Sequence, residues 1–203
     1  MNNQPLILFT SAIISKHEKE REAEYFNSYH NLLIFVPESQ IQVIECYLTN
    51  DLHFRNPIAK YAKKIFYSNT HNPYIRNKGV LEAKGLIEFF NKTEISDDQV
   101  CIKLTGRYYM MESEFIEASK KHDACYTTDS HNQAFTGCIA MRARLFKEFL
   151  LNLDLDQMER DMINIEFLAA RFLEKKSEEG FSVHHMKPIH VWSKINNESI
   201  VYW

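Results

Sequence analysis

Short apolar runs alternate with amphipathic segments along most of this chain, and this alternation limits the possible folds more than any other feature. Runs of strand length lie at residues 6–9, 41–46, 65–67, 100–104, 124–128, 135–141, 183–186 and 189–192. Segments of helical character lie at 17–33, 57–64, 77–90, 114–121, 142–151 and 157–176. Strands that alternate with helices favour a mostly parallel sheet covered by helices, so the predicted fold class is α/β. The length of 203 residues favours one domain over 1–203.

The run Val100–Leu104 is followed by Thr105, Gly106 and Arg107, where a buried strand would end in a tight turn. Open α/β sheets bind their ligands at the carboxyl edge, and an arginine there offers a permanently charged fork. The sequence therefore predicts an anionic ligand beside Arg107. The alternative is that Gly106 only turns the chain and that Arg107 covers a rim.

A second cation stands where the helix of residues 77–90 begins. Asn77 can cap that helix, and Lys78 lies at its amino end. A cation is unfavourable at the positive end of a helix dipole, unless an anion binds there as well. Lys78 is thus a candidate for the same anion, and a solvated lysine without a ligand is the alternative.

Polar residues also follow the first two predicted strands. Thr10 and Ser11 could offer hydroxyls and backbone amides to a ligand, or they could begin an ordinary turn. Glu45 falls near the end of the second strand, where a carboxylate can accept hydrogen bonds from a ribose or a base. A lone acid at such a position is more often a surface residue.

One long helix is predicted over about 157–176, with a core stripe that steps by 4, 3, 4 and 3 residues through Met158, Met162, Ile165, Ala169 and Phe172. Glu166 lies on the adjoining stripe between apolar neighbours, together with Glu159. Partial burial favours the protonated form of a carboxyl group, so Glu166 suits the role of a general base, with a structural glutamate as the alternative. Asp161 lies on the more solvated side.

Composition excludes several classes of protein. The net charge of −3 gives no overall basic field for nucleic acid. No apolar run approaches a membrane span, and Leu6–Ile14 lacks a basic flank before it, so we expect a first strand there and not a signal peptide. The four cysteines are widely spaced and lie in or beside apolar segments, which indicates buried thiols and a cytoplasmic location.

Several catalytic motifs are missing from the sequence. It contains no phosphate-binding G-x-x-x-x-G-K-[ST], no dinucleotide-binding G-x-G-x-x-G and no G-x-S-x-G nucleophile turn. Asp154 and Asp156 are expected to cap the last helix. His184 and His185 could supply an imidazole to a metal or a phosphate, but no second ligand cluster lies near them in the sequence.

A set of short segments resembles one family of enzymes. The segments are Phe9-Thr10-Ser11, Tyr67-Ser68-Asn69, the N-K-G-V-L-E-A stretch at 77–83, the K-L-T-G-R-Y stretch at 103–108 and Ile165-Glu166. They look like those of small glycosyltransferases with the GT-A fold, which occur in bacterial surface-polysaccharide clusters and in large DNA viruses such as chloroviruses. The likeness in strand order spans most of the chain.

The resemblance implies transfer of a sugar from a nucleotide diphosphate donor, such as a UDP-sugar, to a carbohydrate acceptor. It implies a donor site made by Thr10, Ser11, Glu45, Ser68, Asn69, Lys78, Lys103, Thr105, Gly106 and Arg107. For an inverting transfer Glu166 is the first candidate for the base, with Asp161 and Glu159 behind it. Thr136, Gly137 and the more distant Asp129 would lie on the acceptor side.

The sequence departs from this family in one respect. Most members carry D-x-D after the central strand to hold a divalent cation, and this chain has Thr105-Gly106-Arg107 there. A role for Mn²⁺ or Mg²⁺ is therefore left open. Two other functions are left open as well: a non-catalytic module that binds a nucleotide sugar or a glycan, and a hydrolase of phosphorylated sugars, for which a nucleophile motif is missing.

Overall fold

The computed structural model describes residues 4–11, 18–46, 58, 61–70, 72, 74–128, 133–186, 191–195 and 198–202. Its centre is a seven-stranded sheet in the order β3-β2-β1-β4-β7-β6-β8. These strands are β1 Leu6–Ser11, β2 Ile41–Cys46, β3 Ile65–Ser68, β4 Val100–Thr105, β6 Ala124–Tyr126, β7 Cys138–Arg142 and β8 Val183–His185.

Four of the six strand pairs in this sheet are parallel, so the predicted α/β class with a mostly parallel sheet is confirmed. The neighbours of β1 and β2 all run parallel, which sets the ends of β1, β2, β3 and β4 at one edge. β7 runs antiparallel to both β4 and β6, and β8 pairs in parallel with β6.

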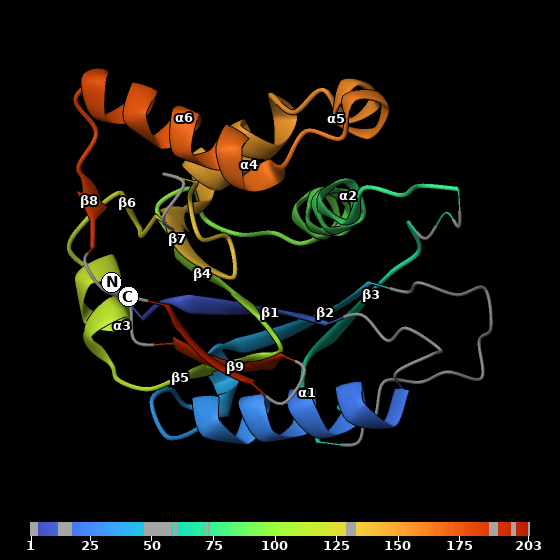
Figure 1. Ribbon diagram of the computed structural model, residues 1–203. Coiled ribbons are helices and arrows are strands. Elements are labelled where there is room, and N and C mark those ends of the chain that lie inside the picture. Colours follow the sequence, from blue (N-terminus) through green and yellow to red (C-terminus); the bar gives the residue numbers. More distant parts are fainter. Residues whose placement is uncertain are drawn as a thin grey trace.

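Helices cover both faces of the sheet (Figure 1). One face carries α2 Lys78–Lys92, α4 Ala143–Leu151, α5 Leu155–Asp161 and α6 Ile165–Glu178. The other face carries α1 Glu18–Leu32 and a small sheet of β5 Tyr108–Met110, β9 Val191–Ile195 and β10 Glu198–Tyr202. The short helices α3 Glu114–Ser119 and Glu38–Gln40 complete the described elements.

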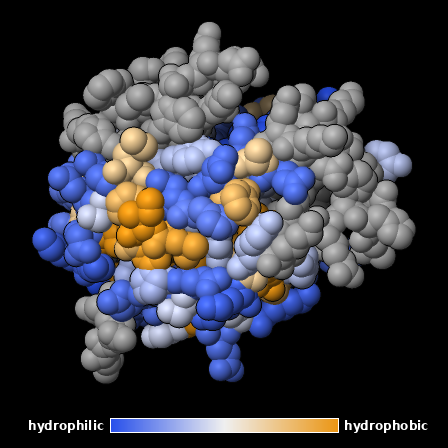
Figure 2. Space-filling view, turned by 90° about the horizontal axis from the view of Figure 1, so that it is seen from below, coloured by the Kyte–Doolittle hydropathy of each residue, from blue (hydrophilic) through white to orange (hydrophobic). Residues whose placement is uncertain are grey.

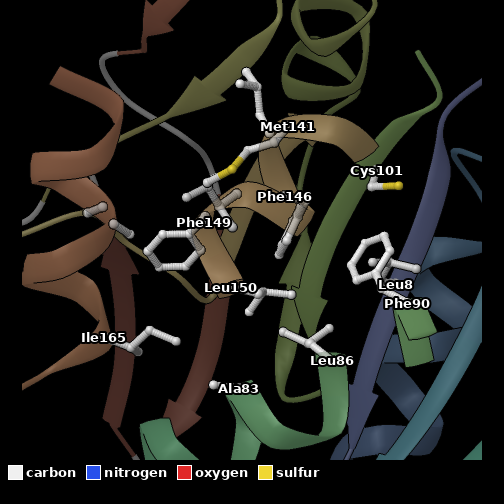
Figure 3. Close-up of a cluster of buried hydrophobic side chains, with 14 of the residues drawn as sticks. Leu8, Ala83, Leu86, Phe90, Cys101, Met141, Phe146, Phe149, Leu150 and Ile165 are labelled. Atoms are coloured by element: carbon white, nitrogen blue, oxygen red, sulfur yellow. The ribbon is translucent and has the colours of Figure 1, made fainter. Parts of the chain in front are cut away.

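Alternation along β1 divides the core in two. Leu8 packs with α2, α4 and α6 in one buried cluster, part of which is drawn in Figure 3, whereas Ile7 and Phe9 belong to the cluster under α1. Successive side chains of a strand point to opposite faces, so a central strand that is covered on both sides is apolar at every position. Figure 2 views the molecule from the side of α1, where hydrophobic side chains gather among hydrophilic ones.

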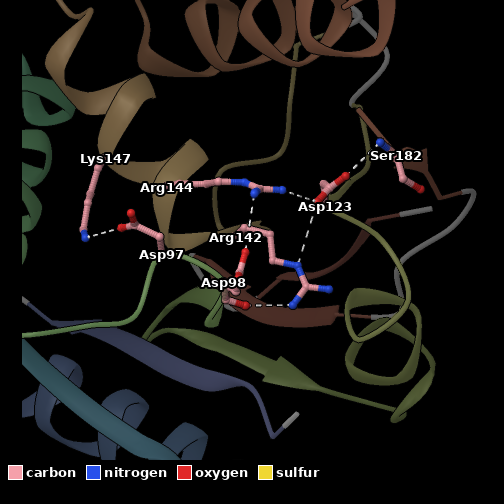
Figure 4. A network of polar contacts seen from close by, with 7 residues as sticks. All are labelled: Asp97, Asp98, Asp123, Arg142, Arg144, Lys147 and Ser182. Atoms are coloured by element: carbon pink, nitrogen blue, oxygen red, sulfur yellow. Dashed lines mark hydrogen bonds and ion pairs between the residues drawn. The ribbon is translucent and has the colours of Figure 1, made fainter. Parts of the chain in front are cut away.

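A polar network closes the sheet at the end opposite to the carboxyl edge of β4 (Figure 4). Asp123 accepts hydrogen bonds from Arg144 Nη2 at 3.1 Å and from the Ser182 amide at 3.0 Å. The Lys147 ammonium lies 2.8 Å from Oδ1 of Asp97, a residue just before β4. This contact holds the pKa of Asp97 below its usual range. We regard the network as structural because it joins α4 to the start of β4.

The prediction of one helix over 157–176 is wrong. The chain leaves the helix at Met162, which adopts a left-handed conformation with φ 53°, and α6 begins at Ile165. Met162 is consequently 50% exposed and does not belong to the core stripe. The break is stabilised from outside, because the Asn77 side-chain amide donates to the carbonyls of Met158 and Ile163, at 2.9 Å each.

Two other predicted elements differ from the structure. The strand predicted over 135–141 begins only at Cys138, because Phe135–Gly137 forms a turn. In this turn the Gly137 carbonyl accepts a hydrogen bond of 2.8 Å from the Thr105 amide. The short helix predicted over 57–64 is not an α-helix where the structure describes it, since Ile58 lies in a 3-10 turn and 61–64 is irregular, and residues 57, 59 and 60 lie outside the described residues. The longest described helices have 15 residues, and none of the described helices has the length and apolar character needed to cross a membrane.

Candidate functional site

A cleft of about 550 Å³ lies at the carboxyl edge of the parallel strands. Its walls come from the end of β1, the first half of α1, the amino end of α2, the turn after β4, residues 133–137 and the start of α6. These segments are far apart in the sequence and meet because parallel strands bring their carboxyl ends to one edge. The predicted site residues fall into those that line this cleft and those that lie outside it.

Thr10 and Ser11 line the cleft from the end of β1. The Thr10 hydroxyl donates to Glu82 Oε1 at 3.1 Å, and the Ser11 hydroxyl donates to Glu45 Oε2 at 2.5 Å. Glu45 is only 1% exposed and does not line the cleft itself. The Ser11 hydroxyl therefore links Glu45 to the cleft.

Lys103 lies beneath the cleft and is 3% exposed. Its ammonium group is 3.0 Å from Glu82 Oε1, donates to Thr105 Oγ1 at 3.1 Å and donates to the carbonyl of Thr136. A buried ammonium must be paired and hydrogen-bonded, and these contacts supply that pairing. Lys103 thus fixes the positions of α2, of the end of β4 and of the loop at 136.

Arg107 projects from the turn between β4 and β5 and lines the cleft. The turn is held by a hydrogen bond of 2.8 Å from the Gly106 amide to the Thr10 carbonyl. A Cβ at position 106 would lie 2.6 Å from Phe9 Cε1, so the Phe9 ring leaves room only for glycine at this position. Arg107 is half-buried, and no described residue forms an ion pair with its guanidinium.

Lys78 and Gly79 line the cleft from the first turn of α2. The predicted cap is confirmed, since the Asn77 side chain accepts a hydrogen bond from the Gly79 amide at 3.0 Å. Lys78 is exposed, and the described part of the chain offers it no carboxylate partner. Lys78 therefore presents its ammonium group to the cleft at the amino end of α2.

Glu166 lies in the first turn of α6 and also lines the cleft. Its Oε1 accepts a hydrogen bond from the Thr136 hydroxyl at 3.0 Å, and its carbonyl accepts one from the Ala134 amide at 3.2 Å. The side chain is half-buried. Thr136 thus holds the carboxylate and Ala134 holds the backbone of the same residue, while the carboxylate still reaches the solvent of the cleft.

The other two candidate bases do not line the cleft. Asp161 is exposed at the end of α5, with its carboxylate 3.3 Å from Arg160 Nε. Glu159 accepts hydrogen bonds from the backbone amides of Arg76 and Asn77, at 2.9 Å each, and these bonds hold the pKa of Glu159 below its usual range. Glu159 therefore anchors the loop before α2. Glu159 shares a stripe with Glu166 only on one continuous helix, and the break at Met162 separates the two, whereas Asp161 was already expected on the more solvated side.

Ser68 and Asn69 follow β3 and also lie outside the residues that line the cleft. The Ser68 hydroxyl and the Asn69 amide both donate to Glu88 Oε2, at 2.7 and 2.9 Å. Burial opposes the ionisation of Glu88, but bonds from Lys92, Ser68 and Asn69 outweigh it and lower the pKa of Glu88. These two residues hold α2 to the edge of the sheet.

The two histidines of β8 have separate partners. His184 stacks on His122 with ring centroids 4.6 Å apart, and His185 stacks on Tyr126 at 4.8 Å. His185 Nε2 also lies 3.1 Å from the Thr128 hydroxyl. No group of three or more potential His, Cys, Asp or Glu ligands occurs within the described ranges. Asp129, predicted on the acceptor side, lies outside these ranges.

Glu82, Arg21 and Tyr25 are among the cleft residues that had no role in the sequence-based prediction. Glu82 lies one helical turn after Lys78 on α2, and the N-K-G-V-L-E-A segment already contained that spacing. Arg21 and Tyr25 line the cleft from α1, again four residues apart. No local motif marked these two, because α1 reads as an ordinary amphipathic helix.

Comparison with known proteins supports the fold. No protein-family model matches the sequence, and no curated protein sequence matches it either. A nucleoside-diphosphate-sugar pyrophosphorylase from Vibrio cholerae RC9 matches in structure with a TM-score of 0.55 and 10% identity, over 89% of this chain and 90% of that one. A predicted nucleotide-diphospho-sugar transferase from Desulfovibrio desulfuricans G20 matches with a TM-score of 0.54 and 9% identity, over 91% of this chain and 80% of that one.

The glycosyltransferase GlyE of Streptococcus pneumoniae TIGR4 matches with a TM-score of 0.53 and 7% identity, over 90% of this chain and 45% of that one. At such identities the likeness concerns the fold alone, and the activity must be argued from the site. The chain therefore has the GT-A-like α/β fold found in enzymes that act on nucleotide sugars.

Proposed function

We propose that this chain is a glycosyltransferase that moves a sugar from a nucleotide diphosphate sugar to a carbohydrate acceptor. The observation that supports this most is the mixture of charges in one cleft, where Lys78 and Arg107 occur together with Glu166. Two cations suit a diphosphate, and a hydrogen-bonded carboxylate suits the removal of a proton. The fold supports the class of donor, since nucleotide sugars are the substrates named for proteins of similar structure.

On the donor side, the diphosphate lies beside Arg107 and Lys78, and the nucleoside lies at the end of β1 near Thr10 and Ser11. The bond between the anomeric carbon and the diphosphate oxygen breaks during transfer, and negative charge builds up on the departing nucleoside diphosphate. Preorganised cations lower the energy of that charge in the transition state. Lys103 keeps Thr105 and Thr136 in place and so holds the floor of the donor site.

On the acceptor side, Glu166 removes the proton of the attacking hydroxyl. The acceptor oxygen bonds to the anomeric carbon from the face opposite to the diphosphate, which inverts the configuration, and the proton moves to the Glu166 carboxylate. Thr136 keeps that carboxylate in place through its hydrogen bond of 3.0 Å. Thr136, Gly137 and Asp129 shape the acceptor pocket in this proposal.

The replacement Glu166→Gln tests the role of the base. It keeps the shape and the bond from Thr136 but removes the proton acceptor, so we expect kcat to fall by roughly 10²-fold or more, with donor affinity nearly unchanged. The matched control is Glu178→Gln, an exposed residue at the far end of the same helix. Equal kcat values for Glu166→Gln and the native protein would exclude the role of Glu166.

The products of a donor and acceptor panel, with UDP-sugars first, test the reaction itself. Release of a nucleoside diphosphate that depends on added glycan supports the transferase. Release that is unaffected by glycans would indicate a hydrolase, release of pyrophosphate from a nucleoside triphosphate would indicate nucleotidyl transfer, and binding without turnover would indicate a binding module. The setting that we propose is the assembly of a surface polysaccharide in the cytoplasm, which follows from the family that the sequence resembles.

A further inference from the structure

The turn after β4 lacks the ligands that a divalent cation requires. Mg²⁺ and Mn²⁺ prefer oxygen ligands, above all carboxylates. β4 ends at Thr105, and Gly106 and Arg107 follow, so this turn contributes no carboxylate and instead contributes a guanidinium. A guanidinium repels a divalent cation and binds the same phosphate oxygens that the cation would bind.

Among the described residues, the carboxylates that line the cleft are Glu82 and Glu166, and each has a hydrogen-bond donor within the protein. Glu82 is 3.0 Å from the Lys103 ammonium and accepts a hydrogen bond from Thr10 at 3.1 Å. Glu166 accepts a hydrogen bond from Thr136. A metal ion bound to Glu82 would have to displace a buried lysine that is only 3% exposed. The residues described around the cleft therefore do not fit a divalent cation.

The cations of the cleft, in contrast, are available. Within the described part of the chain, Lys78 and Arg107 have no ion-pair partner, although both line the cleft. Arg21 lines it too, with its Nη1 3.2 Å from Glu24. The amino end of the 15-residue helix α2 adds its positive dipole beside Lys78. The structure thus brings fixed positive charge to the place where a diphosphate would lie.

From this donor set we infer that Arg107 and Lys78 bind the diphosphate of the donor directly and that no divalent cation takes part in donor binding. This inference rests on the proposed function, because the anion is taken to be the diphosphate of a nucleotide sugar. Arg107 supplies two parallel N–H donors to phosphate oxygens, and Lys78 supplies a mobile point charge at the start of α2.

The test measures binding of UDP, GDP, CDP and dTDP by calorimetry, with EDTA present and then with Mn²⁺ or Mg²⁺ in its place. We expect at least one nucleoside diphosphate to bind in EDTA and its Kd to change by less than about threefold when metal is added. Arg107→Ala and Lys78→Ala should each weaken that binding by roughly tenfold or more, since each removes a charge-assisted hydrogen bond. Arg160→Ala, an exposed arginine at the end of α5, is the matched control and should bind like the native protein.

Three results would overturn the inference. They are binding that occurs only with Mn²⁺ or Mg²⁺, binding that Arg107→Ala leaves unchanged, and no binding of any nucleoside diphosphate with or without metal. Thermal unfolding of each variant shows whether its fold is intact, and Arg107→Lys provides a second variant that keeps the charge but loses the fork. This variant should bind more weakly than the native protein and more tightly than Arg107→Ala.

The failure of this inference and the failure of the proposed function give different results. Glycan-dependent transfer that requires Mn²⁺ would sustain the transferase and overturn metal-free binding. Binding in EDTA without any transfer, across the acceptor panel, would sustain the diphosphate site and overturn the transferase. Binding and transfer are separate measurements, so neither result depends on the other.

Discussion

At the scale of single residues, Lys103 shows how a buried charge organises the cleft. Its ammonium group contacts Glu82 on α2, Thr105 at the end of β4 and the Thr136 carbonyl before β7. Three separate elements are thus held by one side chain that has almost no access to solvent. Removal of Lys103 leaves Glu82, whose side chain is 23% exposed, without its ion-pair partner, and it leaves the buried Thr136 carbonyl without this donor.

We predict that Lys103→Met lowers the free energy of unfolding by about 3–5 kcal/mol, because Glu82 loses its ion-pair partner while the volume of the side chain is nearly kept. The double variant Lys103→Met, Glu82→Gln should recover part of that loss, since the remaining carboxamide carries no charge. Urea unfolding of the native protein and of both variants measures these differences. A cost below about 1 kcal/mol for the single variant would show that the pair does not organise the fold.

At the scale of elements, α2 lies closely against β2 because residue 85 has no side chain. A Cβ at position 85 would lie 2.6 Å from the Sγ of Cys46, the last residue of β2. Contacts this short force the helix or the sulfur to move. The same approach of α2 to the sheet brings Lys78 and Glu82 to the cleft.

We predict that Gly85→Ala destabilises the protein by about 1–3 kcal/mol through this overlap, although alanine favours a helix more than glycine does. In a Cys46→Ala background the sulfur is gone, so the added cost of Gly85→Ala should fall clearly. A double-mutant cycle of unfolding free energies measures the coupling between the two positions. Equal costs in both backgrounds would show that the contact with Cys46 is not the reason for the glycine.

At the scale of the whole molecule, the cysteines show how completely the core excludes solvent. All four are free and buried, and they lie in β2, β4, β6 and β7, across the width of the sheet. Burial raises the pKa of Cys101, Cys125 and Cys138 to about 12 each, and it also raises the pKa of Cys46. The reactive thiolate is therefore scarce in the folded protein at neutral or mildly alkaline pH.

We predict that none of the four thiols of the native protein reacts quickly with a disulfide reagent at pH 8, whereas all four react at once in concentrated guanidinium chloride. Raised thiol pKa values mean that reactivity in the folded state should increase only as the pH approaches the range above 10. The absorbance of the thiolate that the reagent releases measures the reaction rates of the native and of the unfolded protein. One fast thiol in the native protein would identify a cysteine, most simply Cys46 beside the cleft, that is more open than its burial indicates.

Elements with local signals could be predicted from the amino-acid sequence. Apolar runs of strand length and amphipathic segments placed β1, β2, β4, α1, α2 and α4 within a few residues of their observed bounds. The alternation of strands and helices determined the α/β class, since parallel strands need helical connections. From that class alone, Thr10, Ser11, Lys78 and Arg107 were expected at one sheet edge, and the structure places all four on the cleft.

The tertiary structure alone decided which carboxylate reaches that edge. The spacing of Met158, Met162 and Ile165 fits one continuous helix as well as it fits two separate helices. A periodic pattern reflects only contacts made within one segment of the chain. Asn77, about 80 residues earlier, donates to carbonyls on both sides of Met162 and stabilises the break. Glu166 consequently begins a new helix at the cleft, whereas Glu159 and Asp161 remain outside it. Hydrogen bonds between residues that are distant in sequence leave no periodic trace, so only the folded chain reveals them.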